Sequence, residues 1–451
     1  MSRLEKLLKI ITGALLFLLP WQTILITREA FLNGAKWQYG TLGWYATEIL
    51  LWTGVVLFVF WYIKKWRAHK EKPHTFMTPD REFAGALLLF VLYAFAGSIW
   101  AMNGAVAYQH ALHMLEGVLF FFVLFLGPLP FRSAAVWFIF GALVQSVFGL
   151  VQFLLQAAPS SALFGLAPHV AWEAGSSIVS GDALGRWLRA YGAFPHPNVF
   201  GGYLSVSLLL CVFLFHLLAK ENGKEKKNAR LRLFCIVAVV LQAAALSVSF
   251  SRTAWLSATA VFGLSLFLVF HRTRAWAPVL QRIGMFLGAL LLILVALFPL
   301  VYTRVAASSP SEHRSVVERV AGAGEAAGIS QQSFSSFWFG VGAGNYTLSA
   351  FALHPAYPGW AYQPVHSVPL LILVELGIVG SALLLLCAIL FLRYVSMIVS
   401  FDEKKKQALL LLFFAPIVLL LLFDHYLFSS YVGLLFTGLY FGLGSRALRD
   451  I

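Results

Sequence analysis

Apolar runs of about 20 residues recur along almost the whole chain, and they constrain its fold more than any other feature. The runs fall at roughly 10–27, 41–63, 83–101, 109–127, 134–156, 197–218, 233–250, 253–270, 283–303, 366–392, 407–423 and 426–444. A helix of that length crosses the hydrocarbon core of a bilayer. Only 12% of the residues are charged, which is too few to cover soluble domains. We predict an all-α, polytopic membrane protein with about 12 transmembrane helices in a single membrane domain, 1–451.

The distribution of basic residues predicts the orientation of these helices. With a cytoplasmic N-terminus, 25 of the 33 lysines and arginines fall in cytoplasmic connections or at the termini, as the positive-inside rule requires. The net charge of +14 is then mainly a topological signal, and nucleic-acid binding is not expected. Two long connections, 157–196 and 304–365, fall outside, and the other connections are short. A capping box at Ser309–Glu312 predicts an external helix to about Val320, ended by glycines.

Arg252 is the most informative basic residue, because it lies in Ser249-Phe250-Ser251-Arg252-Thr253 between two apolar runs. An arginine buried near the membrane costs a few kcal/mol unless it snorkels or finds a partner. Reaching lipid headgroups is the structural alternative. The neighbouring hydroxyl residues favour an anion-binding site instead.

Arg189 lies shortly before the run that begins at 197. If this stretch is helical, Asp182 and Arg186 form an i,i+4 pair, and Arg189 is the freer anion ligand. Asn198 is expected mainly to cap the next helix.

His366 opens the tenth apolar run at the predicted outer membrane edge. An isolated histidine at a helix start is usually structural, but its position and its aptitude for proton transfer make it a candidate general base. Asp424 and His425, at the outer junction of the last two runs, are the next candidates. Glu375 would lie on the opposite face of the helix from His366 and pair within the bundle.

The segment Gly340-Val341-Gly342-Ala343-Gly344-Asn345 has a superficial likeness to a nucleotide-binding loop, but it follows no strand and lacks the Lys-Ser/Thr of such loops. Acidic residues number only 19, with no cluster on the outer side. Because a divalent metal needs several oxygen ligands, we expect neither a metal nor a cofactor. External arginines with a histidine suggest a diphosphate held by guanidinium groups.

Three spaced motifs over roughly 185–445 together resemble the O-antigen ligase and polymerase superfamily of bacterial envelope enzymes. They are Arg189-x-x-Gly192-x-Phe194-x-x-Pro197-Asn198, then Ser249-Phe250-Ser251-Arg252, then Gly340-Val341-Gly342-Ala343-Gly344-Asn345-Tyr346 followed by His366 and Glu375-Leu376-Gly377-Ile378-Val379-Gly380. Arg319 is similar to an arginine that often precedes the Gly-x-Gly. Ser367 and Ala193 depart from the family pattern, which usually has Asn and often Thr there.

This resemblance implies a metal-independent, inverting glycosyltransferase that uses an undecaprenyl diphosphate-linked glycan as donor. The active site would lie on the periplasmic face of the bacterial inner membrane. Arg189, Arg252 and, as a further candidate, Arg319 would bind the diphosphate, and His366 would activate the acceptor hydroxyl. The expected supporting residues are Asn198, Ser251, Gly342, Gly344 and Glu375.

The acceptor decides which enzyme of this superfamily is present. We favour a ligase that acts on lipid A-core over a polysaccharide polymerase or a protein O-oligosaccharyltransferase. A lipid-linked oligosaccharide flippase and a non-catalytic scaffold are the alternatives from other classes. A flippase is disfavoured because intramembrane acids are sparse and the cations gather at one face.

Overall fold

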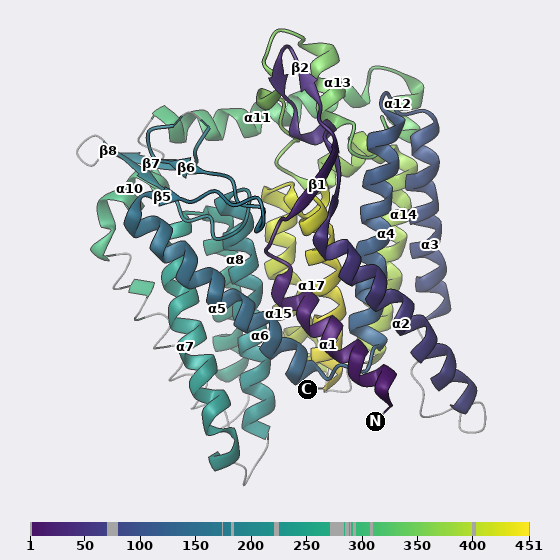
Figure 1. Ribbon diagram of the computed structural model, residues 1–451, viewed down its shortest axis with the longest axis vertical. Coiled ribbons are helices and arrows are strands. Elements are labelled where there is room, and N and C mark those ends of the chain that lie inside the picture. The colour runs from purple at the N-terminus through teal and green to yellow at the C-terminus, as the bar shows by residue number, and fades with distance from the viewer. Residues whose placement is uncertain are drawn as a thin grey trace.

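The computed structural model of the chain is a bundle of long helices capped at one end by short hairpins and helices (Figure 1). It describes residues 2–69, 80–173, 175–181, 185–220, 225–270, 284, 288, 290–291, 295–306, 310–398 and 403–450. Among these residues, seven helices are long and apolar enough to cross a membrane. They are α2 (Ala46–His69), α3 (Arg81–Ala96), α4 (Gly104–Leu126), α5 (Phe131–Leu155), α6 (Pro197–Lys220), α7 (Glu225–Ser249) and α14 (Val368–Ile398). The prediction of a mostly helical, multi-pass membrane protein is confirmed.

Other helices pack with these seven to complete the bundle. They are α1 (Arg3–Leu18), α8 (Arg252–Phe270), α15 (Glu403–Phe423), the single turn α16 (Tyr426–Ser429) and α17 (Tyr431–Asp450). Of the seven apolar helices, α6 is the most enclosed, because 89% of the residues in its apolar stretch are buried inside the protein. α4 and α17 approach closely through glycines, and a Cβ added to Gly438 would lie 2.1 Å from the carbonyl oxygen of Gly117. Small residues allow such close helix contacts in membranes.

The first apolar run does not form the helix that its length suggests. Helix α1 ends at Leu18, just before Pro20, and the chain continues as strand β1 (Ile24–Arg28). The connection to α2 is therefore long, contrary to expectation. Proline cannot continue a helix without losing a hydrogen bond, and the β-branched residues that follow suit an extended backbone.

In the part of the chain that the structure describes, four two-stranded antiparallel sheets depart from the all-α prediction. β1 pairs with β4 (Leu42–Tyr45) and β2 (Phe31–Leu32) with β3 (Ala35–Lys36). In the long connection at 157–196, β5 (Ala157–Ala158) pairs with β6 (His169–Val170), and β7 (Ile178–Gly181) pairs with β8 (Gly185–Leu188). All these hairpins lie at one end of the bundle, here called the loop end, and both chain termini lie at the opposite end (Figure 1).

The second long connection contributes helices to the loop end. These are α11 (Pro310–Ser330), α12 (Phe334–Phe339) and α13 (Tyr346–Leu353), preceded by α10 (Phe298–Ala306), which spans the end of the ninth apolar run and the start of this connection. Ser309 of the predicted capping box lies outside the described residues. The predicted stop at Gly322 and Gly324 is wrong, because α11 continues through both glycines. Its second half buries Ala326 and Ile329 and packs on α13 and α14, and such packing outweighs the roughly 1 kcal/mol helix penalty of a glycine.

Candidate active site

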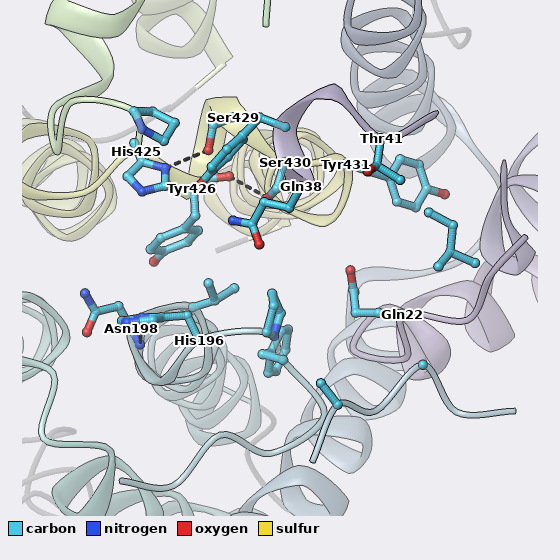
Figure 2. Close-up of a pocket in the computed structure, with 18 of the residues that line it drawn as sticks. Gln22, Gln38, Thr41, His196, Asn198, His425, Tyr426, Ser429, Ser430 and Tyr431 are labelled. Atoms are coloured by element: carbon cyan, nitrogen blue, oxygen red, sulfur yellow. Dashed lines mark hydrogen bonds between the residues drawn. The ribbon is translucent and has the colours of Figure 1, made fainter. Parts of the chain in front are cut away.

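A cavity of about 730 Å³ opens among the hairpins and helix ends of the loop end. His366 lines it together with Asp424 and His425 from the junction of α15 and α16. Figure 2 shows His425 on one wall and His196 with Asn198, at the start of α6, on the facing wall. The cavity therefore gathers polar side chains from segments far apart in the sequence.

His366 lies directly beside a buried carboxylate. Its Nδ1 is 3.7 Å from Oδ1 of Asp424, which is close enough for an ion pair but longer than a hydrogen bond. The side chain of Asp424 is 4% exposed, whereas that of His366 is 30% exposed. The histidine is thus accessible from the cavity, and the carboxylate lies behind it.

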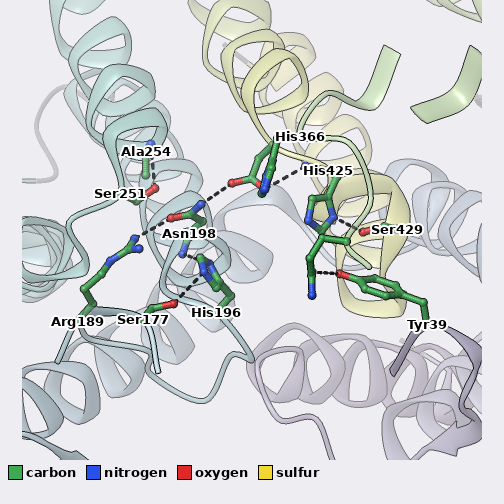
Figure 3. Close-up of polar contacts among 12 residues, drawn as sticks. Tyr39, Ser177, Arg189, His196, Asn198, Ser251, Ala254, His366, His425 and Ser429 are labelled. Carbon is green, nitrogen blue, oxygen red and sulfur yellow. Dashed lines mark hydrogen bonds and ion pairs between the residues drawn. The ribbon is translucent and has the colours of Figure 1, made fainter. Parts of the chain in front are cut away.

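A row of hydrogen bonds extends from Asp424 through Asn198 to Arg189, and Figure 3 shows Asn198 between His366 and Arg189. Asn198 donates from Nδ2 to Oδ2 of Asp424 over 2.8 Å, and Arg189 donates from Nη2 to Oδ1 of Asn198 over 2.7 Å. Arg189 is only 4% exposed, and its Nε donates to the carbonyl of Ser249. The amide of Asn198 is therefore oriented by a donor on one side and an acceptor on the other.

The helical pairing predicted for Arg186 is wrong. Arg186 lies on strand β8, where its Nε donates to the carbonyl of Ala171 and its side chain is exposed. Asp182 lies outside the described residues. The idea that Arg189 is the freer of the two arginines is also wrong, because Arg189 is the buried, hydrogen-bonded one.

Burial and neighbouring charges set the protonation of this site. Burial would raise the pKa of Asp424, but the interaction with His366 and the charges of the nearby histidines outweigh it, so this pKa lies below its usual value. Burial lowers the pKa of His425 to about 4, although Asp424 acts in the opposite direction. Burial and the charge of Arg189 hold the pKa of His196 well below its ordinary range. The site therefore holds an ionised carboxylate with neutral His196 and His425 at neutral pH.

Two glutamines on α5 fix the segment that precedes Asn198. Gln152 accepts from the backbone N–H groups of Tyr191 and Gly192, and Gln145 accepts from that of Ala193. Both glutamines are almost fully buried. The backbone of Ala193 makes this contact, so the departure from threonine there leaves it intact.

Arg252 begins α8 at a tight turn that follows α7. Ser251 accepts from the N–H of Ala254 and so caps the helix, while Phe250 takes a left-handed φ of 48°. The buried Arg304 of α10 donates to the carbonyl of Phe250 over 2.8 Å. This contact was not foreseen, because nothing in the sequence around Arg304 marks a partner. Arg252 is half-buried on this turn. Arg189 contacts the same turn, because its Nε donates to the carbonyl of Ser249.

Arg319 approaches the site from α11. It is half-buried, and its positive charge, after burial and the charge of His366, contributes to the lowered pKa of His425, against the opposing effect of Asp424. The structure thus brings positive charge toward the histidines from the loop connection as well as from the bundle.

The glycine-rich loop has a structural role, together with Glu375. The carboxylate of Glu375 accepts from the N–H groups of Gly344 and Tyr346, over 2.7 and 3.3 Å, and so caps α13. Its backbone carbonyl accepts from Gly342 N–H. At Gly377 helix α14 is broken by a φ of 66°, and a Cβ there would lie 2.5 Å from the nitrogen of Gly340. The expectation that Glu375 pairs within the protein and does not touch His366 agrees with these contacts.

Among the described side chains, two groups have spacings that could hold a metal ion. In each, the possible ligand atoms lie within 4.8 Å of one another. One consists of His366, Asp424 and His425, in which Nδ1 of His425 already contacts the hydroxyl of Ser429 over 2.7 Å. The other lies deeper in the bundle, at Glu48, His113 and Glu116.

Comparison with known protein families finds a match over part of the chain. Residues 237–385 match the family model described as O-antigen ligase, which confirms the resemblance over these residues. The matched region contains the Arg252 turn, Arg319, the glycine loop and His366, whereas Arg189, Asn198 and Asp424 lie outside it. No curated protein is similar enough to the chain to count as a match.

Proposed function

Because the chain carries an O-antigen ligase domain, we propose that it transfers a glycan from undecaprenyl diphosphate to an acceptor hydroxyl, with lipid A-core as acceptor. The observation that carries this proposal is the row of His366, Asp424 and Asn198 along a cavity at the loop end, with the buried Arg189 behind Asn198. It places a candidate base, a buried carboxylate and a cation in one connected arrangement.

His366 is the general base in this proposal. A sugar hydroxyl is a weak nucleophile at neutral pH, so a base must remove its proton as the new bond forms. Nδ1 of His366 faces Asp424, which leaves Nε2 to accept that proton. The carboxylate of Asp424 then orients the ring and balances its new positive charge, as in other carboxylate–histidine pairs.

The arginines stabilise the leaving group. The acceptor oxygen bonds to the anomeric carbon while the bond from that carbon to the diphosphate oxygen breaks, and undecaprenyl diphosphate departs with the bonding electrons. Arg252 and Arg319 bind this diphosphate, because planar guanidinium groups match phosphate oxygens. Arg189, fixed behind Asn198, adds positive charge and holds the amide in place. The step requires no metal ion or cofactor.

The same proposal includes the topology. The chain is one membrane domain, 1–451, with twelve spans and both termini in the cytoplasm. The connections at 157–196 and 304–365 lie on the periplasmic face of a bacterial inner membrane. Their joint position at the loop end, opposite both termini, supports this arrangement (Figure 1).

The test is transfer by the purified full-length protein. The donor is an undecaprenyl diphosphate-linked glycan, offered with lipid A-core, with a second glycan or with an acceptor protein. We expect a product on lipid A-core and a strongly reduced rate of its formation with His366→Ala. Product on glycan or protein would make the enzyme a polymerase or an oligosaccharyltransferase. Donor translocation in proteoliposomes without any covalent product would replace the proposal with a flippase.

A further inference from the structure

A second polar cluster is buried between α2 and α4, and one of its members, His113, also lines the cavity. Glu48 lies in the first turn of α2, and His113 and Glu116 lie one turn apart on α4. These residues are 2%, 8% and 0% exposed. Because both helices are apolar enough to span a membrane, ionisable residues at this depth carry a high energetic cost and call for a function.

Each member of this cluster has an unused ligand atom. Oε1 of Glu48 accepts from the N–H of Tyr45, and Oε1 of Glu116 accepts from the indole N–H of Trp52. Oε2 of both glutamates and Nε2 of His113 are buried and have no hydrogen-bond partner among the described residues. The cluster thus contains three unsatisfied atoms from side chains that are at least nine-tenths buried.

One nitrogen or oxygen atom from each of the three side chains lies within 4.8 Å of the others, a spacing that suits a bound cation. Nε2 of His113 lies 3.6 Å from Oε1 of Glu48, the oxygen that also accepts from Tyr45 N–H, and this is too long for a hydrogen bond between them. It is close to the roughly 3.4 Å expected between two ligands that each bond a tetrahedral zinc ion at 2.0–2.2 Å. Two carboxylates in a low-dielectric interior require a positive charge or protons, and a divalent ion supplies a charge of the right size.

We propose that Glu48, His113 and Glu116 bind a divalent transition-metal ion of the zinc class, with its remaining coordination position open toward the cavity. One histidine and two carboxylates form a ligand set that zinc accepts. The donors from Tyr45 and Trp52 orient the carboxylates, as outer-layer partners of metal ligands do.

The ion would stabilise the part of the cavity wall that His113 lines. His113 lines that cavity, together with Tyr45 and Tyr431, whose rings stack at 4.3 Å between centroids. Tyr431 is visible on the cavity wall in Figure 2. An ion shared by α2 and α4 would therefore hold the first turn of α2 and the adjacent β4 against the bundle. This role is structural and does not depend on the proposed glycosyl transfer.

The test measures metal binding and needs no substrate. Purified full-length protein is stripped with EDTA and titrated with Zn²⁺ or Co²⁺, and bound metal is counted by mass spectrometry. Visible d–d absorption of Co²⁺ reports the coordination geometry. We expect one ion per chain, no stoichiometric binding by Glu116→Gln or His113→Gln, and roughly 10- to 100-fold weaker binding by Trp52→Phe.

Two controls locate the ion. Glu82→Gln removes an exposed carboxylate on α3 that pairs with Arg393, and it should bind the ion like the unaltered protein. Asp424→Asn disrupts the other candidate cluster and should also retain the ion. Loss of the ion in Asp424→Asn but not in Glu116→Gln would overturn the proposal. The ligand variants could fail to purify as monodisperse protein. In that case the thermal stability of the stripped, unaltered protein is measured as Zn²⁺ is added. Stabilisation that saturates at one Zn²⁺ per chain supports the site, and no stabilisation overturns the proposal.

Discussion

Asn198 donates a hydrogen bond to Asp424 over 2.8 Å, although 226 residues separate them in the sequence. This contact joins the start of α6 to the junction of α15 and α16, beside His366. The contact connects Arg189, which donates to Asn198, with His366, which lies beside Asp424.

Asp424→Asn should reduce turnover about 10- to 100-fold while donor binding changes little. The amide keeps the shape of the carboxylate but cannot stabilise a protonated His366, and losing a contact with a charged group costs about 1.5–3 kcal/mol. Initial rates and donor affinity measured on the same preparation would check this. An unchanged rate would remove Asp424 from the proposed mechanism.

His366→Ala should reduce turnover by about 10²–10⁴-fold, the range typical of a lost general base, and donor binding should persist. His354→Ala is the matched control, because His354 is an exposed histidine in the same connection. If His366→Ala loses donor binding at an unchanged chemical rate, His366 holds the diphosphate and is not the base.

Arg252→Lys should be nearly as harmful to turnover as Arg252→Ala, roughly 10- to 100-fold, because lysine cannot offer the planar fork that binds two phosphate oxygens. Arg186→Ala is the control at an exposed arginine of the loop end and should change turnover little. Normal turnover in Arg252→Lys would indicate that this arginine reaches lipid headgroups and does not bind the diphosphate.

Acid should destabilise the protein partly through His425. Its folded pKa of about 4 lies below its ordinary value of 6.5. Between pH 6.5 and about 4 the unfolded chain therefore binds a proton that the folded site does not, and stability falls as the pH falls. His425→Gln should shrink the difference in Tm between pH 7 and pH 5. An equal difference in both proteins would show that His425 does not contribute.

Labelling of single cysteines should place the loop end outside the cell membrane. The native cysteines Cys211, Cys235 and Cys387 are buried, so they provide a low background. Val320→Cys on α11 is at a site that is 71% exposed and should react with an impermeant reagent in intact cells. Arg67→Cys, exposed near the C-terminal end of α2, should react only after permeabilisation. The reverse pattern would contradict the proposed topology.

The sequence by itself determined the class of the fold and most candidate residues, because both follow from local patterns. Backbone groups of apolar runs must be hydrogen-bonded within helices in lipid, and the residues around Arg252 and His366 follow short sequence motifs in a fixed order. Helix boundaries were less well determined. The length of α11 depends on where Ala326 and Ile329 pack, and local glycine signals carry no information about that packing.

Only the tertiary structure decided which side chains meet. The partnership of Asn198 with Asp424 joins segments 226 residues apart, and the cluster of Glu48 and Glu116 assembles two acids that appear isolated in the sequence. It also showed that Arg189 is buried behind Asn198 while Arg186 is exposed on a strand. These outcomes follow from helix packing within the bundle, where each buried polar group must find a partner, and no local sequence pattern specifies that partner.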